Sequence, residues 1–196
     1  MLDSIPTLRG PHASLVPIDP VRHAPGLFAV TDPDTFRYFP ACPPAWELAA
    51  FTDYLTTHAA SPRTRAFVAF DAAGQIVGST SYLDIDPANR AVEVGSTWYT
   101  PAARGTVINP QCKLLMLTHA FEALGCVRVT LKCDARNTHS QRAIAKLGAV
   151  REGVLRRHRI MHDGFVRDTV YFGITHDEWP TIRDNLCRRI GPDPVH

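Results

Sequence analysis

The sequence predicts one α+β domain built on a single mixed sheet, and three observations support this prediction. The chain has 196 residues, of which 45% are hydrophobic and 20% are charged, as expected for one compact globular domain. Strand-like runs follow one another through the middle of the chain and are separated only by short turns. Helical patterns stand before and after this block. Because no linker, repeat or low-complexity tract interrupts the sequence, we expect residues 1–196 to form a single domain.

The first 60 residues carry one strand region and two helical patterns. Residues 7–19 are expected to form an edge strand or a short hairpin broken at Gly10-Pro11. The patterns at 21–31 and 43–60 are helical, and the second is expected to begin at its prolines, which a first helical turn tolerates.

The middle of the chain predicts an antiparallel meander. Three strands are expected at 65–71, 75–86 and 90–100. Gly74 stands in the first intervening turn and Pro87-Ala88-Asn89 form the second, as turn chemistry requires.

The second half alternates helices and strands. The elements expected are a helix at 109–125, a strand at 128–134, a helix at 137–149, a hairpin at 154–174 and a helix at 175–190. Gly125 stands where the first of these helices should stop, and Asp163-Gly164 favours the tight reversal of the hairpin.

One face of the helix predicted at 137–149 carries three apolar side chains and one hydroxyl. These residues are Ser140, Ala143, Ile144 and Leu147. The hydroxyl of Ser140 either has a functional partner or bonds back to the carbonyl four residues earlier. Asn137, one turn before Ser140, suits the helix cap.

Charge and hydropathy weigh against several classes of protein. The formal net charge of +2 is too small to indicate a nucleic-acid or anionic-membrane partner. No apolar run approaches the roughly 20 residues of a membrane span. Because the start, MLDSIPTLRG, lacks the pattern of a secretory signal, a cytoplasmic location is expected.

Metal and disulfide sites are not indicated either. The cysteines are Cys42, Cys112, Cys126, Cys133 and Cys187. Their odd number and the lack of a C-x-x-C pair argue against a disulfide framework or a zinc site. His158 and His162 belong to a predicted strand, where four residues span about 13 Å, too far for one metal ion.

The junction at 97–113 has the features of a phosphate site. A strand enters a proline-bearing turn and a glycine, and a long helix follows, whose first amides lack internal partners and lie at the positive end of the helix dipole. Gly105 would let a ligand approach the backbone, and Arg104 could add a charged contact. An ordinary strand-to-helix turn is the alternative.

Four stretches together resemble the GNAT superfamily of acyl-CoA-dependent N-acetyltransferases, closest to the branch of ribosomal-protein N-terminal acetyltransferases. They are QIVGSTSYLDI, RAVEVGSTWYTPAARGTVINPQCKLLMLTHAFEALG, RVTLKCDARNTHSQRAIAKLGAVREGVLRRH and DGFVRDTVYF. The resemblance implies a central splayed strand pair flanked by helices, with acetyl-CoA as co-substrate and no metal. It also implies acceptor-side elements at 1–60, an acetyl-CoA-binding core at 65–174, and a C-terminal helix and tail at 175–196.

The resemblance places cofactor contacts on particular residues. The implied set is Thr97, Trp98, Tyr99, Arg104, Gly105, Thr106, Val107, Ile108, Asn109, Asn137 and Ser140. The family's glycine-rich loop falls on residues 102–107, where only Gly105 is retained, because Ala102 and Val107 depart from the pattern. The amides of this turn exist whatever their side chains, except at Pro110, which has no N–H.

Catalytic roles are implied less completely. Ile144 stands where relatives often have the tyrosine that protonates the departing thiolate, and Ser140 lies one turn earlier on the same helical face. We therefore expect Ser140 to assist the leaving sulfur. Glu93 is the expected base, Glu152 is a second candidate, and a water chain without a dedicated base is a third possibility.

The expected reaction is attack of a primary amine, from a peptide or a small molecule, on the thioester. The aromatic residues that could line an amine pocket or form core are Phe36, Tyr38, Phe39, Trp46 and Tyr54. A homodimer is plausible.

A non-enzymatic acyl-CoA-binding or sensory domain is the first alternative, and a nucleic-acid module using the arginines of the final hairpin is the second. The near-balanced charge argues against the latter. Those hairpin arginines are Arg156, Arg157, Arg159 and Arg167.

Overall fold

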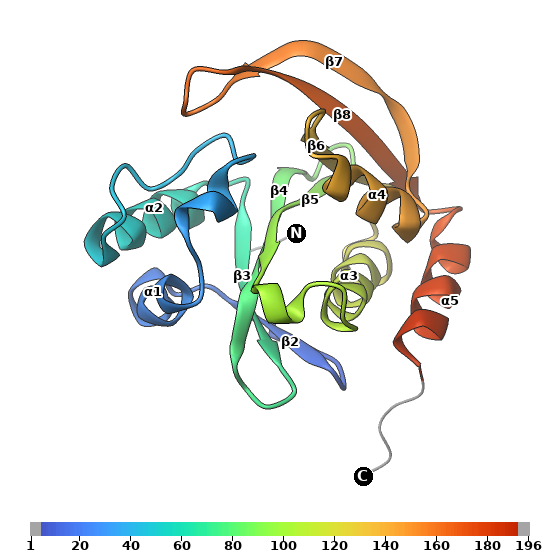
Figure 1. Cartoon of the computed structure of the whole chain (residues 1–196). Coiled ribbons are helices and arrows are strands. Elements are labelled where there is room, and N and C mark those ends of the chain that lie inside the picture. The colour runs from blue at the N-terminus through green and yellow to red at the C-terminus, as the bar shows by residue number, and fades with distance from the viewer. Residues whose placement is uncertain (1–4, 192–196) are drawn as a thin grey trace.

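The computed structural model describes residues 5–191 and contains one eight-stranded sheet with helices on both faces (Figure 1). The strands are β1 (Leu8–Arg9), β2 (Ala13–Pro17), β3 (Arg65–Asp71), β4 (Ile76–Asp86), β5 (Ala91–Tyr99), β6 (Arg128–Asp134), β7 (Val150–Ile160) and β8 (Val166–Thr175), in the order β1-β2-β3-β4-β5-β6-β8-β7. The helices are α1 (Pro20–Ala29), α2 (Leu48–Ala60), α3 (Ile108–Thr118), α4 (Thr138–Leu147) and α5 (Trp179–Ile190). All neighbouring strands pair antiparallel except β5 and β6, which pair parallel, so the predicted mixed, mostly antiparallel sheet is confirmed.

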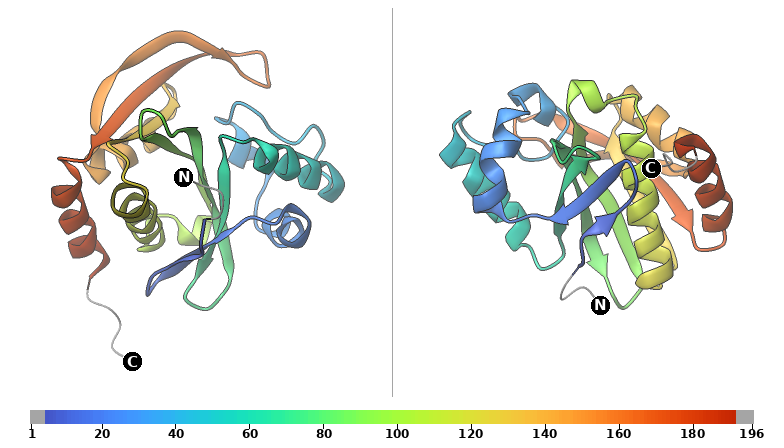
Figure 2. Two further views of the ribbon diagram at one scale, coloured as in Figure 1. Left: turned by 180° about the vertical axis from the view of Figure 1, so that it is seen from behind. Right: turned by 90° about the horizontal axis from the view of Figure 1, so that it is seen from below.

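Two hydrophobic cores lie on opposite faces of the sheet (Figures 1 and 2). The larger core joins the sheet to α3, α4 and α5, and contains the fully buried ring of Tyr82, whose hydroxyl donates to the Met116 carbonyl at 2.6 Å. The smaller core lies under α1 and α2 around Phe36 and Phe51. Phe36 is buried in this core, and the half-buried rings of Phe39, Trp46 and Tyr54 pack against it.

The N-terminal elements follow the prediction with one exception. β1 and β2 form the expected hairpin, and the amide of Gly10 donates to the Ala13 carbonyl across its turn. The second helix was predicted to begin at the prolines, but α2 begins only at Leu48. The segment before it is irregular because Trp46 turns back to pack against the rings of Phe28 and Phe51.

The helix predicted at 109–125 is confirmed as α3 followed by a single π-helical turn, His119–Ala123. Gly125 ends it in the left-handed region, at φ 65°. The last helix begins at Trp179 rather than at residue 175, because Glu178 folds back to accept the amide of Thr175.

In α4 the predicted cap is confirmed, since Asn137 Oδ1 accepts the Ser140 amide at 2.9 Å. Ile144 and Leu147 are buried, whereas Ala143, expected on the same buried face, is exposed. The reason is that Ala143 lies at the rim of a hollow between α3, α4 and α5 rather than against the sheet.

The predicted hairpin is confirmed as β7 and β8, with β7 starting at Val150. Asp163 and Gly164 form its tip, where Asp163 Oδ1 accepts the Phe165 amide at 3.0 Å and Gly164 has φ 81°. The tip reaches back across the sheet toward the loop between α1 and α2 (Figure 1).

Candidate active site in the wedge between β5 and β6

The central parallel strands separate after a short paired stretch. β5 and β6 pair from Ala91 with Arg128 to Glu93 with Thr130, and then β5 continues along β4 while β6 continues along β8. We call the space between residues 94–99 of β5 and 131–134 of β6 the wedge. Its two strand edges do not pair with each other. The predicted central splayed pair is therefore present.

A β-bulge lies in the β5 side of the wedge. Gly95 pairs with Ser81 and Trp98 pairs with Ser79, so Ser96 and Thr97 together oppose Thr80. Ser96 adopts the left-handed region at φ 45°, which is unusual for a residue other than glycine. Backbone strain of this kind gathers at functional sites because it re-aims a strand.

The bulge changes which residues face each side of the sheet. Before it, Val92 and Val94 belong to the larger core and Glu93 faces the opposite side. After it, Tyr99 belongs to the larger core, and Trp98 packs against the smaller core. The strand alternation is thus shifted by one residue within the wedge.

The turn after β5 has the features that the sequence predicted for a phosphate site. Gly105 has φ 77° and no atom near its missing side chain, so a ligand can approach its backbone. Thr106 Oγ1 accepts the Ile108 amide at 3.3 Å and donates to the Ala103 carbonyl, which ties the turn to the start of α3. Hydrogen bonds within residues 5–191 leave the amides of Val107 and Asn109 without a partner at the helix N-terminus.

Arg104 supports this turn as well as extending from it. Its Nε donates to the Tyr99 carbonyl at 2.9 Å, and its side chain is otherwise exposed. Tyr99 itself points into the core, where its ring is buried beside the Cys112 thiol. Any contact from Tyr99 to a ligand in the wedge would therefore come from its backbone.

Glu93 is a buried carboxylate on the α2 face of the wedge. It is only 4% exposed and forms an ion pair with Lys132, at 2.5 Å between Oε2 and Nζ. Lys132 also binds Asp84, at 2.9 Å. Burial raises the pKa of Glu93 to about 7, against the opposing attraction of Lys132. A carboxylate with such a pKa is poised to accept a proton near neutrality.

Glu152 lies elsewhere. Its carboxylate forms a two-point ion pair with Arg128, which pairs with Ala91 at the closed end of β5 and β6, away from the wedge. The Arg128 guanidinium lowers the pKa of Glu152. Its ion pair and its position make Glu152 a weaker candidate for the base than Glu93.

Ser140 lies on the β6 side of the wedge. It is half-buried, and its hydroxyl lies near the Cys133 thiol of β6, where it opposes the rise that burial causes in the pKa of that thiol. The hydrogen bonds of the described chain do not include the alternative, a bond from this hydroxyl to the Arg136 carbonyl. The role of this hydroxyl at the leaving sulfur stays a prediction.

Lys113 is a buried cation that sequence reasoning did not single out. It is 8% exposed, and its Nζ donates to Thr97 Oγ1 at 3.0 Å. Thr97 Oγ1 also shares a hydrogen bond with Thr80 Oγ1 at 2.7 Å. The sequence does place Lys113 four residues after Asn109, on the same helical face. Because lysine is rarely buried, that position could have marked Lys113 as a candidate site residue.

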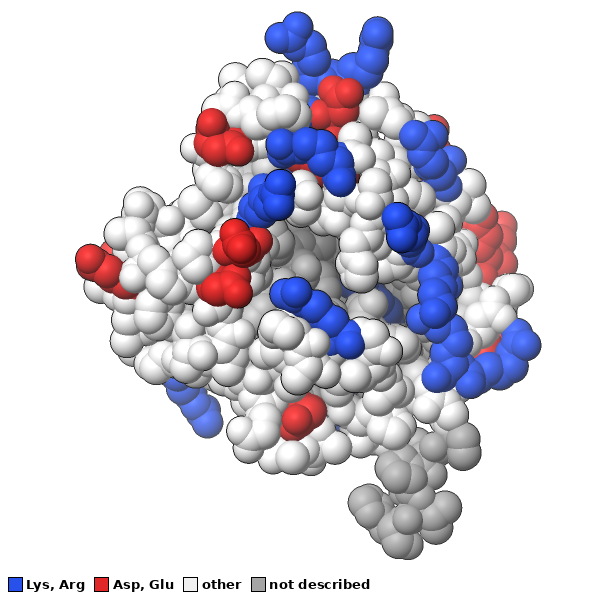
Figure 3. Space-filling model, in the orientation of Figure 1, with Lys and Arg blue, Asp and Glu red and all other residues white. Residues whose placement is uncertain are grey.

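A hollow between three helices opens beside Lys113. Its lining residues are Asn109, Pro110, Lys113, Ala143, Ile144, Leu147, Leu186 and Arg189. Lys113 thus belongs both to this hollow and, through Thr97, to the wedge. Figure 3 shows basic side chains gathered over α4 and α5 on this side of the molecule. Arg142, Arg188 and Arg189 are exposed on these two helices.

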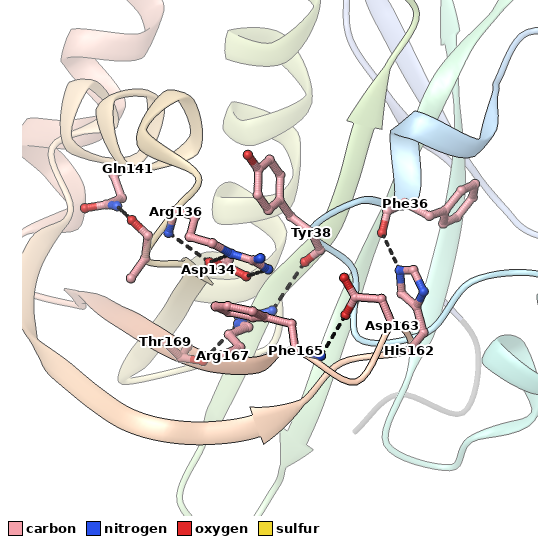
Figure 4. Close-up of polar contacts among 11 residues, drawn as sticks. Phe36, Tyr38, Asp134, Arg136, Gln141, His162, Asp163, Phe165, Arg167 and Thr169 are labelled. Carbon is pink, nitrogen blue, oxygen red and sulfur yellow. Dashed lines mark hydrogen bonds and ion pairs between the residues drawn. The ribbon is translucent and has the colours of Figure 1, made fainter.

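The tip of the β7–β8 hairpin lies beside Asp134 and Arg136, at the end of β6, and beside the loop between α1 and α2 (Figure 4). The Arg136 guanidinium lies 3.4 Å from the centre of the Phe165 ring and is held by an ion pair with Asp134, at 2.8 Å. Arg167 Nη1 donates to the Tyr38 carbonyl at 3.3 Å. These contacts join the hairpin to the loop between α1 and α2.

The hairpin arginines do not form one surface. Arg156, Arg157 and Arg159 are exposed, but Arg167 is 6% exposed, and its Nε donates to Thr169 Oγ1 at 3.0 Å.

Within the described chain, no group of three or more metal-ligating side chains comes together. None of the helices between residues 5 and 191 is long and apolar enough to cross a bilayer.

Comparisons with known proteins agree with this geometry. A family model described as "Acetyltransferase (GNAT) domain" matches residues 14–150. The chain is 30% identical over 107 residues to "Putative ribosomal N-acetyltransferase YdaF" of Bacillus subtilis, covering 54% of this chain and only 57% of that relative's length.

Solved structures resemble the chain over more of its length. A GCN5-related N-acetyltransferase from Brucella melitensis is 28% identical, with a TM-score of 0.88 over 95% of this chain and 86% of that one. RimJ of Mycobacterium smegmatis, solved in complex with CoA-disulfide, is 24% identical, with a TM-score of 0.75 over 92% and 91% of the two chains.

Proposed function

The chain belongs to the acetyltransferase (GNAT) family, and on this premise we propose that it transfers an acetyl group from acetyl-CoA to a primary amine. The wedge is the observation that carries the proposal. A buried carboxylate lies on one face of β5, while the turn proposed to bind the diphosphate and the helical hollow lie on the other. An amine and a thioester could therefore approach the same strand from opposite sides.

The cofactor would enter from the α3 and α4 side. In this proposal the amides after Gly105 and the Arg104 guanidinium hold the diphosphate, with Thr106, Val107, Ile108 and Asn109 supplying the turn. Because Ile108 already donates to Thr106, the amides of Val107 and Asn109 are the better donors. Exposed basic side chains nearby would favour approach of the anionic nucleotide.

The thiol arm would then lie along the β5 edge of the wedge. Backbone groups of Thr97, Trp98 and Tyr99 are the proposed partners of the arm, and one strand amide near Trp98 would polarise the thioester carbonyl. Asn137 stands across the wedge, where its side chain already caps α4. A further contact from Asn137 to the arm is part of the proposal.

The reaction would be a direct attack. The neutral amine attacks the thioester carbon, and the amine proton passes to Glu93 directly or through water. An α-amine, whose pKa is near 8, needs less help than a lysine amine, whose pKa is about 10.4. Ser140 would hydrogen-bond the sulfur as the C–S bond breaks, which its half-buried position beside the wedge supports.

The acceptor class follows from the family and is proposed as a primary amine on a peptide or a small molecule. The B. subtilis relative is described as a ribosomal N-acetyltransferase, which makes a protein N-terminus the first acceptor to examine. The proposal places the reaction in the cytoplasm, where ribosomal proteins are made.

A second function has one observation in its favour. Ile144 is buried in the position that resembles the family's tyrosine, and Val107 replaces a small residue in the turn. A chain with these changes could bind acyl-CoA as a sensor without turning it over.

One experiment separates the two functions. Calorimetry with acetyl-CoA measures binding, and release of free CoA thiol is then measured with a panel of peptide N-termini, amino acids and polyamines. Binding with thiol release on at least one amine supports the transferase. Binding without release on any amine supports the sensor, and no binding of acetyl-CoA contradicts both.

A further inference from the structure

Lys113 is a buried ammonium group whose surroundings supply no balancing charge. Ion pairs within residues 5–191 do not involve it, and its Nζ has one protein partner, Thr97 Oγ1 at 3.0 Å. An ammonium carries three N–H donors. Burial disfavours the charged form of such a group, so an anionic partner placed beside its Nζ would stabilise the ammonium.

The position of Lys113 defines what that partner must be. Its side chain lines the hollow between α3, α4 and α5, and its Nζ reaches Thr97 on the wedge edge of β5. Ile144 and Ala143 line the same hollow from α4 and offer no polar atom of their own. A ligand arm that reached Thr97 from this side would meet the Lys113 ammonium, because the two side chains are hydrogen-bonded.

Glu93 cannot serve as the counter-ion, because it lies on the other face of β5. It is paired with Lys132 on the α2 side, whereas Thr97 and Lys113 lie on the α3 side of the bulge. The sheet therefore separates a proton acceptor from a proton donor.

We propose that Lys113 is a catalytic residue that contacts the CoA sulfur and stabilises it as the thiolate departs; this inference rests on the proposed function. As the nitrogen–carbon bond forms and the C–S bond breaks, the electron pair leaves on sulfur. The Lys113 ammonium hydrogen-bonds the thiolate and gives it a proton, so CoA leaves as the thiol. The amine proton goes to Glu93 or water, and solvent returns one proton to Lys113, which balances the reaction.

The acidity of the group suits this role. Burial lowers the pKa of Lys113 to about 8, close to the value of about 8.5 for a simple thiol such as cysteine. Proton transfer between groups of matched pKa is efficient, whereas an ordinary lysine would be a much weaker acid. Ser140, on the β6 side, would contribute a neutral hydrogen bond to the same sulfur.

The test titrates the thiol of CoA while it is bound to the protein, which needs no acceptor. Thiolate absorbance is followed from pH 6 to 10 for CoA with excess wild-type protein, Lys113→Met and Lys146→Met, and the signal of each protein alone is subtracted. Methionine matches the length of a buried lysine stem, and Lys146 is an exposed lysine on α4. We expect the bound thiol to titrate at least about one unit lower in wild type and Lys146→Met than in Lys113→Met.

A second measurement uses the wild-type chain alone. NMR of the lysine side chains, of which there are only three, follows the Lys113 amine with and without CoA. We expect its pKa to rise when the thiolate is present, and unchanged titration of the amine would contradict the proposal even if Lys113→Met does not fold.

The outcomes are distinct from those that test the proposed function. If CoA binds and its thiol titrates alike in wild type and Lys113→Met, Lys113 is not beside the sulfur, and the transferase proposal stands. If Lys113→Met changes only the acetyl-CoA Kd, and not the thiol pKa or kcat, Lys113 is a binding residue and the inference is wrong. If CoA does not bind to the wild-type protein, the proposed function itself fails.

Discussion

The side chains of Glu93 and Thr97 project from opposite faces of β5, although they are four residues apart on one strand. Glu93 pairs with Lys132 on the α2 side, and Thr97 bonds to Thr80 and Lys113 on the α3 side. In a regular strand an even spacing would place both on one face. The bulge at Ser96 adds one residue, which places the two side chains on opposite faces. It thereby also separates Glu93 from Lys113, the two groups proposed to transfer protons.

Substituting Ser96 tests the bulge. A β-branched residue is strongly disfavoured at φ 45°, so Ser96→Val is expected to lower the free energy of unfolding by about 2 kcal/mol. Ser96→Gly should stay within about 1 kcal/mol of wild type, because glycine adopts this region freely. Urea unfolding measures both. Ser14→Val, in the extended strand β2, is the control, and equal effects of the two valines would argue against strain at residue 96.

The acid limb of the pH profile should belong to Glu93. Only the ionised carboxylate accepts a proton, so kcat/KM for acetyl transfer is expected to rise with pH through about 7. Glu93→Gln should lower kcat/KM by about 10²-fold or more and abolish that limb. Glu152→Gln removes a carboxylate from the ion pair with Arg128 and should leave the profile intact. An unchanged acid limb in Glu93→Gln would point to a water chain instead.

Ser140→Ala should slow turnover more than it weakens cofactor binding. Its hydrogen bond to the CoA sulfur would strengthen only as the thiolate develops, so we expect kcat to fall about tenfold while the acetyl-CoA Kd changes by less than about threefold. Thiol release and calorimetry give the two numbers. Since the cap of α4 comes from Asn137 rather than from Ser140, thermal stability should hardly change. Kinetics equal to wild type would remove Ser140 from the mechanism.

Gly105 should matter for the cofactor more than for the fold. An alanine at φ 77° is strained by about 1 kcal/mol, and the turn would relax by rotating its amides away from the diphosphate. We expect the acetyl-CoA Kd of Gly105→Ala to rise about tenfold or more. Gly153→Ala, at a position in β7 with open space and an ordinary backbone, is the matched control. Equal affinities in both variants would mean that the turn does not hold the phosphates.

The sequence predicted the elements because their local patterns agree with the final packing. The meander from β3 to β5, the Asn137 cap and the reversal at Gly164 all rest on short-range chemistry that the fold preserves. The splayed strand pair and the acetyl-CoA site came from the resemblance. The start of α2 was wrong because a distant contact, Trp46 on Phe28, overrides the helical pattern.

The features most specific to the site were beyond sequence reasoning. The sequence does not reveal the bulge at Ser96 and Thr97, because both residues are small and polar and would suit either face of the sheet. The burial of Lys113 and of Arg167 depends on elements that are distant in sequence: β5 for the lysine, and β8 and the α1–α2 loop for the arginine. Only the assembled sheet shows that a cation, rather than another apolar side chain, stands next to the wedge.

The three residue pairs that join β5 to β6 also make the sheet a pair of half-sheets held by a narrow seam. One half contains β1 to β5, and the other contains β6, β8 and β7. Beyond Glu93 and Thr130, β5 and β6 do not pair with each other. A ligand whose amide groups hydrogen-bonded to both strands would bridge the gap and restrict the motion of the two half-sheets relative to each other. Amide hydrogen exchange along residues 94–99 and 131–134 would then slow on cofactor binding, so the exchange rate would report binding without any need for catalysis.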